Sequence, residues 1–374
     1  MSARPIRLAA AALAAVALGG CAGFSADGGF GTVEQAASER LGKDVRWARS
    51  DAERAALDAR VDALLAEALT ADDAVQVALL NNRGLQAAFD ELGIAEAAFV
   101  QAGRLPNPGF GFGRLRRGDE TEIERSLHVD LARLLAMPMV REMESRRFER
   151  VKREAAAAML SLAADTRKAW VAAVAAEQSV RYMGQVREAA DASAELARRM
   201  ARAGNWNKLQ QAREQGFYAD AALGLARAER LRDATRERLT RLMGLWGERA
   251  QFRLPERLPD LPEALLDIPD VERRAIAQRL DVQAARLGVE QTAKNLGLTR
   301  ATRFVDVLEL GAVRNSSNEA PTQRGWEVSF ELPLFDWSGA RVARAEAIYM
   351  QSLNRAAAIA IDARSEVREA YRAY

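Results

Sequence analysis

Two stretches of this chain alternate between apolar and polar residues with a period of two, the pattern of a β-strand with two unlike faces. In the stretch over 109–133, Ile123, Leu127 and Val129 would share one face with Leu131. The opposite face would carry Glu124, Ser126, His128 and Asp130. Upstream, Phe110 and Phe112 alternate with glycines, and a charged turn over 116–120 (RRGDE) separates the two expected strands.

The second alternating stretch, over 304–333, is more regular. Trp326, Val328 and Phe330 alternate with Glu327, Ser329 and Glu331. Its partner strand is expected over 304–313, and the polar segment 314–319 (RNSSNE) is expected to be an exposed loop between the two strands. Each stretch therefore predicts a β-hairpin.

The remaining pattern is helical. Helices are expected over 51–69, from Thr70 to about Gly103, over 139–202, over 208–245 and over 270–300, whereas 22–45 is expected to be irregular. Thr70 and Asp73 would form a capping box, and the two prolines of 105–108 (LPNP) would stop the second helix. The helix over 139–202 would be about 96 Å long. Its apolar positions are mostly alanine, which suits close packing in a sheath of helices.

The chain also repeats itself over a long period. The sequence LQAA at 85–88 precedes the first hairpin, and VQAA at 282–285 precedes the second. Likewise, TRKAW at 166–170 corresponds to VREAY at 367–371. The repeat is a whole architectural unit rather than a short solenoid module. Two hairpins cannot close a barrel alone, so this internal duplication predicts several chains around one axis.

Alternation by itself leaves two interpretations open. Strands of about 10 residues with an apolar outer face and a polar inner face are typical of a membrane barrel with a wet interior. A water-soluble sheet with one buried face would show the same pattern. The N-terminal signal described next favours the membrane interpretation.

The N-terminus has the features of a secretion signal. Arg4 and Arg7 precede an apolar run over 8–18, which is short for a membrane span. The run ends in LGGC at 18–21, which is similar to a bacterial lipobox and would make Cys21 the lipidated (palmitate-bearing) first residue of the mature protein. The alternative is an ordinary signal peptide with an incidental cysteine. Ala22, rather than Asp, favours the outer membrane by resemblance to bacterial lipoproteins.

Composition narrows the function classes. The 54 Lys and Arg residues nearly balance the 52 Asp and Glu residues, which argues against nucleic acid as a partner. Abundant Ala, Arg, Glu and Leu with 6% aromatic residues indicate long helices and coiled coils. One Cys and one His exclude an internal disulfide and a Cys/His zinc site. No cofactor is expected beyond the lipid on Cys21.

No catalytic constellation stands out, so the chain is not expected to be an enzyme. His128 lies on the polar face of a predicted strand and is expected to line a lumen. The sequence GFGFG at 109–113 lacks the lysine and helix of a phosphate loop. Met137, Met139 and Met143 could ligate Cu(I) as thioethers, but packing is the simpler interpretation.

At this point the chain resembles the TolC-type outer membrane factors, especially lipid-anchored ones of drug and heavy-metal efflux. The match covers about 70–374. Its pieces are AVQVALLNN at 74–82, LPNP at 105–108, AGN at 203–205, LTRLMGL at 239–245 and LPLFD at 332–336. Each piece is weak alone, and their order and spacing together are specific.

The resemblance implies a homotrimer in the outer membrane of a Gram-negative bacterium. The fold would be mainly α with a transmembrane β part: long antiparallel coiled-coil helices would form a periplasmic α-barrel, and two hairpins per chain would join a 12-stranded β-barrel. A periplasmic adaptor protein and an inner-membrane efflux pump would dock at the far end. The adaptor-contact tip falls here on Ala203, Gly204, Asn205 and Trp206, although Gly204 could also simply cap a helix.

The expected division follows the repeat. It comprises a signal peptide (1–20), an anchored segment (21–69), a first repeat (70–250, with the helix pair 139–245), a Pro-rich linker (251–269) and a second repeat (270–374). The chain stops within a helix, so the second repeat is expected to be incomplete, and the resemblance implies that the periplasmic gate lies beyond Tyr374. A natural short variant is the alternative.

The expected function is a passive exit duct of a tripartite efflux system for drugs or metal ions. The candidate pore-lining residues are Glu124, His128, Asp130, Glu327 and Glu331. A duct for type I protein secretion would use the same architecture. A lipid-anchored periplasmic coiled-coil scaffold is the alternative from another class. The transported substrate does not follow from the sequence.

Overall fold

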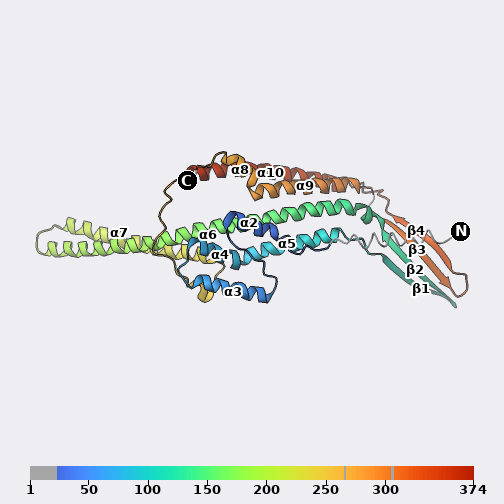
Figure 1. Ribbon diagram of the computed structural model, residues 1–374, viewed down its shortest axis with the longest axis horizontal. Helices are drawn as coiled ribbons and strands as arrows, with labels where there is room; N and C mark the ends of the chain where they lie inside the picture. The colour runs from blue at the N-terminus through green and yellow to red at the C-terminus, as the bar shows by residue number, and fades with distance from the viewer. Residues whose placement is uncertain (1–22, 265–266, 305–306) are drawn as a thin grey trace. The chain divides into compact units, whose positions relative to one another are not determined.

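The computed structural model describes residues 23–264, 267–304 and 307–374. Its helices and strands are labelled in Figure 1. Cys21, the predicted lipid site, lies outside the described residues. The chain forms two compact units. The first comprises the described part of Met1–Gly31 with Glu91–Glu154 and Ile268–Tyr374, and the second comprises Thr32–Asp90 with Ala155–Asp267. Both hairpins join one sheet in the first unit, and the division into two repeats stays a prediction.

The second unit is built from helices. Its elements are α2 (Gly31–Leu41), α3 (Asp51–Leu65), α4 (Ala71–Asn81), the start of α5 (Arg83–Ala102), the greater part of α6 (Leu131–Arg202), α7 (Lys208–Met243) and the short 3-10 helix η1 (Gly247–Ala250). The expectation of irregular structure over 22–45 was wrong for α2, whose first turn is stabilised by Asp27: its carboxylate accepts the Gly31 N–H at 2.9 Å. That bond and the one from Gly29 lower the pKa of Asp27.

The predicted capping box at Thr70 is confirmed. The Thr70 hydroxyl accepts the Asp73 N–H at 3.1 Å, and the Asp73 carboxylate accepts the Thr70 N–H at 3.2 Å. The single helix expected from Thr70 to Gly103 was wrong, however, because Asn82 is extended (ψ 118°) and separates α4 from α5. The Asn82 side chain accepts the Leu85 N–H at 2.9 Å, so a short amide ends one helix and caps the next.

The core of the second unit surrounds one tryptophan. Trp170 of α6 is 3% exposed and donates its indole N–H to the Leu69 carbonyl at 2.8 Å. Residues of α3, α4 and α7 pack in the same cluster, which consists of Val61, Leu69, Ala74, Val77, Ala78, Leu80, Ala169, Trp170, Ala173, Val174, Leu239, Met243, Leu245 and Phe252. Two alanines of α6, Ala169 and Ala173, pack closely in this core, whereas the sheath of helices stays a prediction.

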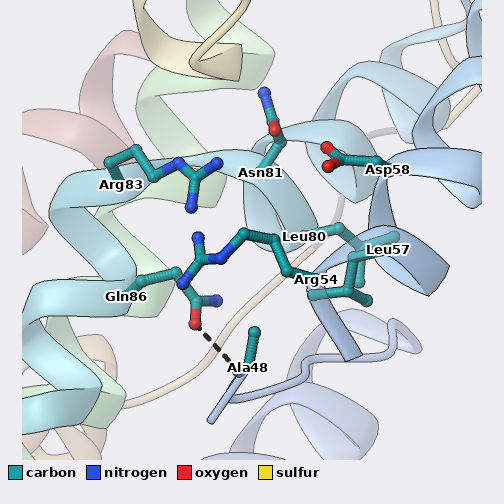
Figure 2. Close-up of a pocket in the computed structure, with 8 residues that line it drawn as sticks. All are labelled: Ala48, Arg54, Leu57, Asp58, Leu80, Asn81, Arg83 and Gln86. Carbon is teal, nitrogen blue, oxygen red and sulfur yellow. Dashed lines mark hydrogen bonds between the residues drawn. The ribbon is translucent and has the colours of Figure 1, made fainter. Parts of the chain in front are cut away.

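Two buried glutamines hold the segment that leads from α2 to α3. Gln76 exchanges hydrogen bonds with the backbone of Asp44, donating to its carbonyl at 2.8 Å. Gln86 accepts the Ala48 N–H at 3.0 Å and donates to the Arg46 carbonyl at 2.8 Å. Figure 2 shows the first of these two Gln86 bonds at the corner of α3, α4 and α5. The small pocket there measures about 10 Å³, room for about one water molecule.

Replacing Gln86 by Leu is expected to loosen this segment. Leucine has a similar size but cannot pair with the backbone, so the Ala48 N–H and the Arg46 carbonyl would lose their partners at a cost of about 1–3 kcal/mol each. Hydrogen exchange should rise at residues 44–48 and little elsewhere. Gln101→Leu, at an exposed position of the same helix, is the control. Equal exchange in both variants would contradict the role assigned to Gln86.

Helix α6 begins earlier than the pattern predicted. The helix was expected from Met139, but it starts at Leu131 and contains Pro138. The Asp130 carboxylate accepts the Arg133 N–H at 2.8 Å and so caps the new start. Pro138 lies inside the helix, and α6 continues past it although proline lacks the N–H for one backbone bond. With 72 residues, α6 is about 108 Å long.

Helix α7 follows the turn after α6 and has a capping box between Asn207 and Gln210. It was expected to reach Leu245, but it ends at Met243 because Gly244 takes the left-handed conformation (φ 67°). A side chain at this glycine would approach the Asn81 carbonyl oxygen to 3.0 Å. The glycine therefore serves both the turn and the close packing of α7 beside α4.

The first unit contains the sheet and a helical group. Its helices are α8 (Val271–Gln278), α9 (Leu280–Ala301) and α10 (Gly339–Ala373), beside parts of α5 and α6, and its strands are β1 (Gly109–Arg117), β2 (Glu120–Asp130), β3 (Leu308–Ser317) and β4 (Gln323–Phe330). In Figure 1, α9 and α10 lie side by side and the four strands form one ribbon. The single helix expected over 270–300 was wrong, because the extended residue Arg279 divides it.

Ion pairs join the helices of the first unit. Arg279 contacts Asp281 at 2.7 Å and Glu366 of α10 at 2.6 Å. Burial raises the pKa of Asp281, but the hydrogen bond and charge of Arg279 outweigh it, so the pKa lies below its usual value. Lys294 of α9 contacts Glu142 of α6 at 2.9 Å. These ion pairs lie at partly exposed positions, while Leu280, Val282, Leu296 and Ala363 of the same helices are buried.

Candidate functional site

The four strands form one antiparallel sheet in the order β1-β2-β3-β4, so the two hairpins pair directly through β2 and β3. Directly opposite residues of antiparallel strands lie on the same face. Phe110 is opposite Leu127, which is opposite Ala312, which in turn is opposite Trp326. Following the register in this way assigns every strand residue to one of two faces.

We call one of them the apolar face. It carries Phe110, Phe112, Ile123, Leu127, Val129, Leu308, Leu310, Ala312, Trp326, Val328 and Phe330, with Thr121, Ser316 and five arginines. These large apolar side chains are not covered: Trp326 is 78% exposed and Phe110 68%. Exposed apolar surface of this extent marks an interaction with lipid or with another protein. The alternation predicted from the sequence is thus present in the sheet.

The other, polar face carries the carboxylates. Glu124, His128, Asp130 and Glu327, four of the five predicted pore-lining residues, lie on it. Glu331 is one residue beyond β4, where its N–H donates to the Val307 carbonyl at 3.4 Å. Asp130 is also the cap of α6, so its carboxylate has a structural role as well. The sheet therefore brings Glu124, His128 and Glu327 to one surface.

Glycines on the polar face explain the GFGFG sequence. A side-chain carbon at Gly109 would lie 2.0 Å from Nε2 of His128, and one at Gly111 would lie 2.3 Å from Oγ of Ser126. Gly311 has the same relation to Glu327 at 2.8 Å. Polar side chains of one strand thus cover glycines of the next. Glycine leaves room for these side chains, and such room is needed on the crowded inner side of a curved sheet.

The predicted tip is the turn between α6 and α7 in the second unit. Gly204 has φ 76°, and the Asn205 N–H donates to the Met200 carbonyl at 2.9 Å, which confirms Gly204 as the residue that ends α6. Ala203, Gly204 and Asn205 are exposed and Trp206 is half-buried. In the last turns of α6, a hydrogen bond from Arg199 at 2.9 Å and the nearby charges of further arginines lower the pKa of Glu195. The role of the tip in docking stays a prediction.

The three methionines noted in the sequence do not share one cavity. Met137 lines a cavity of about 300 Å³ between α5 and the start of α6, together with Arg104, Arg133 and Glu144. Met139 and Met143 are not among its lining residues. In the described part of the chain, no group of three or more His, Cys, Asp or Glu side chains could hold a metal ion.

Sequence reasoning missed the arginines of the sheet. The segment 314–319 was expected to be a loop, yet β3 continues to Ser317 because Arg314 and its neighbours pair with β2. Likewise, Arg116 and Arg117 belong to β1 and Glu120 to β2, so only Gly118 and Asp119 remain as the turn. These strand residues could have been predicted by continuing the two-residue period of each strand beyond its last apolar residue.

None of the helices formed by the described residues is both long and apolar enough to cross a membrane.

No protein-family model matches the chain, and no curated protein matches it. Solved structures do. The Campylobacter jejuni outer membrane channel CmeC aligns over 90% of this chain and 75% of its own, with a TM-score of 0.67 and 17% identity. The outer-membrane channel OprN aligns over 81% and 74% (TM-score 0.65, 19% identity), and VceC of Vibrio cholerae over 81% and 76% (TM-score 0.60, 16% identity).

The chain has the TolC-type outer membrane factor fold. The resemblance seen in the sequence is thus confirmed at the level of the fold, with long helices and a small β-sheet. In an outer membrane factor fold, the exposed apolar face of β1–β4 and the α6–α7 turn are the two surfaces that call for a functional explanation.

Proposed function

We propose that this chain is the outer membrane exit duct of a tripartite efflux system. Three copies would each supply four strands to a 12-stranded barrel, with helices extending into the periplasm and a lipid on Cys21. The duct would passively conduct drugs or metal ions delivered by an inner-membrane pump and a periplasmic adaptor, the latter docking at residues 203–206. The observation that carries the proposal is the two-faced sheet, together with the fold it shares with outer membrane channels.

The strand lengths support a membrane location for the sheet. They run from 8 to 11 residues, close to the length of a tilted strand that crosses the hydrocarbon layer. The edges β1 and β4 each have one unpaired side within the described chain. Closure with other copies would satisfy both edges, which lipid could not do. The glycines of the polar face support its inward orientation in such a barrel.

Carboxylates on the polar face would give the duct a preference for cations. In planar bilayers, wild-type protein is expected to form cation-preferring channels, and the variant Glu124→Gln/Glu327→Gln is expected to lose most of that preference while still conducting. Glu263→Gln removes an exposed carboxylate of the linker and is the control.

The same experiment tests the proposed function itself. If the wild-type protein stays soluble and monomeric without detergent and forms no channels, the duct is refuted and the periplasmic scaffold is favoured. Conductance with an unchanged ion preference in the double variant would refute only the assignment of the pore-lining residues.

A further inference from the structure

We propose that the apolar face of the sheet binds anionic phosphate-bearing lipid through a row of arginines near the hairpin turns. The proposal rests on the membrane location of the sheet proposed above. It adds a specific ligand chemistry to that surface: a phosphate head group held by guanidinium groups, with the acyl chains on the neighbouring apolar residues.

The register aligns three arginines side by side. Arg125 of β2 is opposite Arg314 of β3, and Arg314 is opposite Arg324 of β4. Arg114 and Arg116 of β1 lie on the same face, closer to the turn. Like charges directly opposite each other destabilise a sheet. A row of this kind is therefore favourable only where something negative lies between the guanidinium groups.

Charge is divided between the two faces of the sheet with one exception. Over β1–β4, the apolar face carries five arginines and no carboxylate: Arg114, Arg116, Arg125, Arg314 and Arg324. The strand carboxylates all lie on the polar face: Glu120, Glu122, Glu124, Asp130, Glu309 and Glu327. The one arginine on the polar face is Arg117. The sheet itself therefore offers the row no counter-charge on its own side.

The guanidinium groups of the row retain unused donors. Arg125 donates to the Ser316 hydroxyl at 3.4 Å, a long bond. The side chains of Arg314 and Arg324 are exposed, and neither guanidinium group has a hydrogen bond or ion pair with any part of the chain that the structure describes. Each guanidinium has five N–H donors in a planar fork that matches the oxygens of a phosphate.

Apolar rows adjoin the arginine row on the side away from the turns. The nearest consists of Phe110, Leu127, Ala312 and Trp326, two residues or about 7 Å along the strands. Beyond it come Leu310 with Val328, and then Leu308 with Phe330. The face thus presents a hydrocarbon-like band bordered by positive charge. An amphiphile with apolar chains and a negative head has the complementary order.

Lipid accounts for this face better than an acidic protein would. Arginine on the lipid-contacting side of a barrel is unfavourable near the midplane, and its cost falls toward the interface, where its long side chain reaches the head groups. At the level of the head groups, an anionic phosphate can accept charge-assisted, bidentate hydrogen bonds from the guanidinium groups, which offsets the remaining cost. An acidic protein would supply the negative charge but not the acyl chains that would cover Trp326 and Phe110.

Trp326 provides the measurement, because it lies one row from the arginines. The full chain is reconstituted in phosphatidylcholine with increasing phosphatidylglycerol whose acyl chains are brominated, and quenching of Trp326 fluorescence gives the relative association constant. Trp326→Phe supplies the background from other tryptophans. Each arginine removed from the row should weaken anionic lipid binding about fivefold. The variant Arg125→Gln/Arg314→Gln/Arg324→Gln should abolish the preference.

The controls separate this proposal from the proposed function. Arg117→Gln makes the same charge change on the polar face and should keep the wild-type preference. A carboxylate-headed lipid at equal charge should bind more weakly than phosphatidylglycerol. If brominated phosphatidylcholine quenches Trp326 but phosphatidylglycerol is not preferred, or if Arg117→Gln has the same effect as Arg314→Gln, the lipid site is refuted. If no brominated lipid quenches Trp326, the membrane location of the sheet fails as well.

Discussion

Replacing Trp170 by Ala is expected to destabilise the second unit by about 3–5 kcal/mol, the usual cost of emptying a tryptophan site in a core. Trp170 is 3% exposed and packs with residues of α3, α4 and α7. Its indole also donates to the Leu69 carbonyl at 2.8 Å, in the short connection that leads into α4. The substitution would therefore leave a cavity and an unpaired buried carbonyl at the same place, and both effects have the same sign.

The expected loss is local to the second unit, since the described chain forms two compact units. Hydrogen exchange of the α4 and α7 backbones is the appropriate measurement, because one melting temperature would combine separate transitions. Trp246→Ala is the control, since Trp246 is 81% exposed. Trp170→Phe should recover part of the packing but not the hydrogen bond. Similar exchange in the Trp170→Ala and Trp246→Ala variants would refute the core assigned here.

Local signals in the sequence were reliable where one or two residues determine the geometry. The Thr70 capping box and the Gly204 turn depend on a side-chain oxygen or on an allowed positive φ, and both occur as predicted. The alternation in β2 and β4 was also readable, because each strand has one apolar and one polar side. These features need no information about distant parts of the chain.

Helix breaks were missed for the opposite reason. A single extended residue, Asn82 or Arg279, divides a helix without disturbing the apolar periodicity on either side. Helix propensity alone does not distinguish such a residue from its neighbours. The early start of α6 was missed because a proline is unfavourable inside a helix, whereas α6 continues through Pro138.

The pairing of β2 with β3 is the feature that sequence reasoning could not supply. It joins Glu122 to Ser317, across a long separation in the chain, and thereby unites the two hairpins. The same pairing explains why the basic and polar residues after Val313, which were expected to form a loop, belong to β3. The three arginines of the row come from three different strands, so only the register of the sheet brings them side by side.

Placing a charge on the apolar face should have the second large effect. Val328 is opposite Leu310, and these two residues form the row that lies between the row of Trp326 and the row of Phe330. If this row lies near the middle of the bilayer, Val328→Arg should cost about 2–4 kcal/mol per chain on folding into vesicles. Because a trimeric barrel would carry three such changes, assembly in the membrane should be strongly reduced.

Ser329→Arg, at the neighbouring position, provides a sharp comparison. Ser329 is opposite Glu309 on the polar face, where an added guanidinium would meet carboxylates and water. The two variants have the same new side chain, one residue apart on the same strand. Urea titration of protein folded into phosphatidylcholine vesicles should show a large loss for Val328→Arg and little change for Ser329→Arg. The reverse order would mean that the polar face contacts lipid, and equal losses would mean that neither face does.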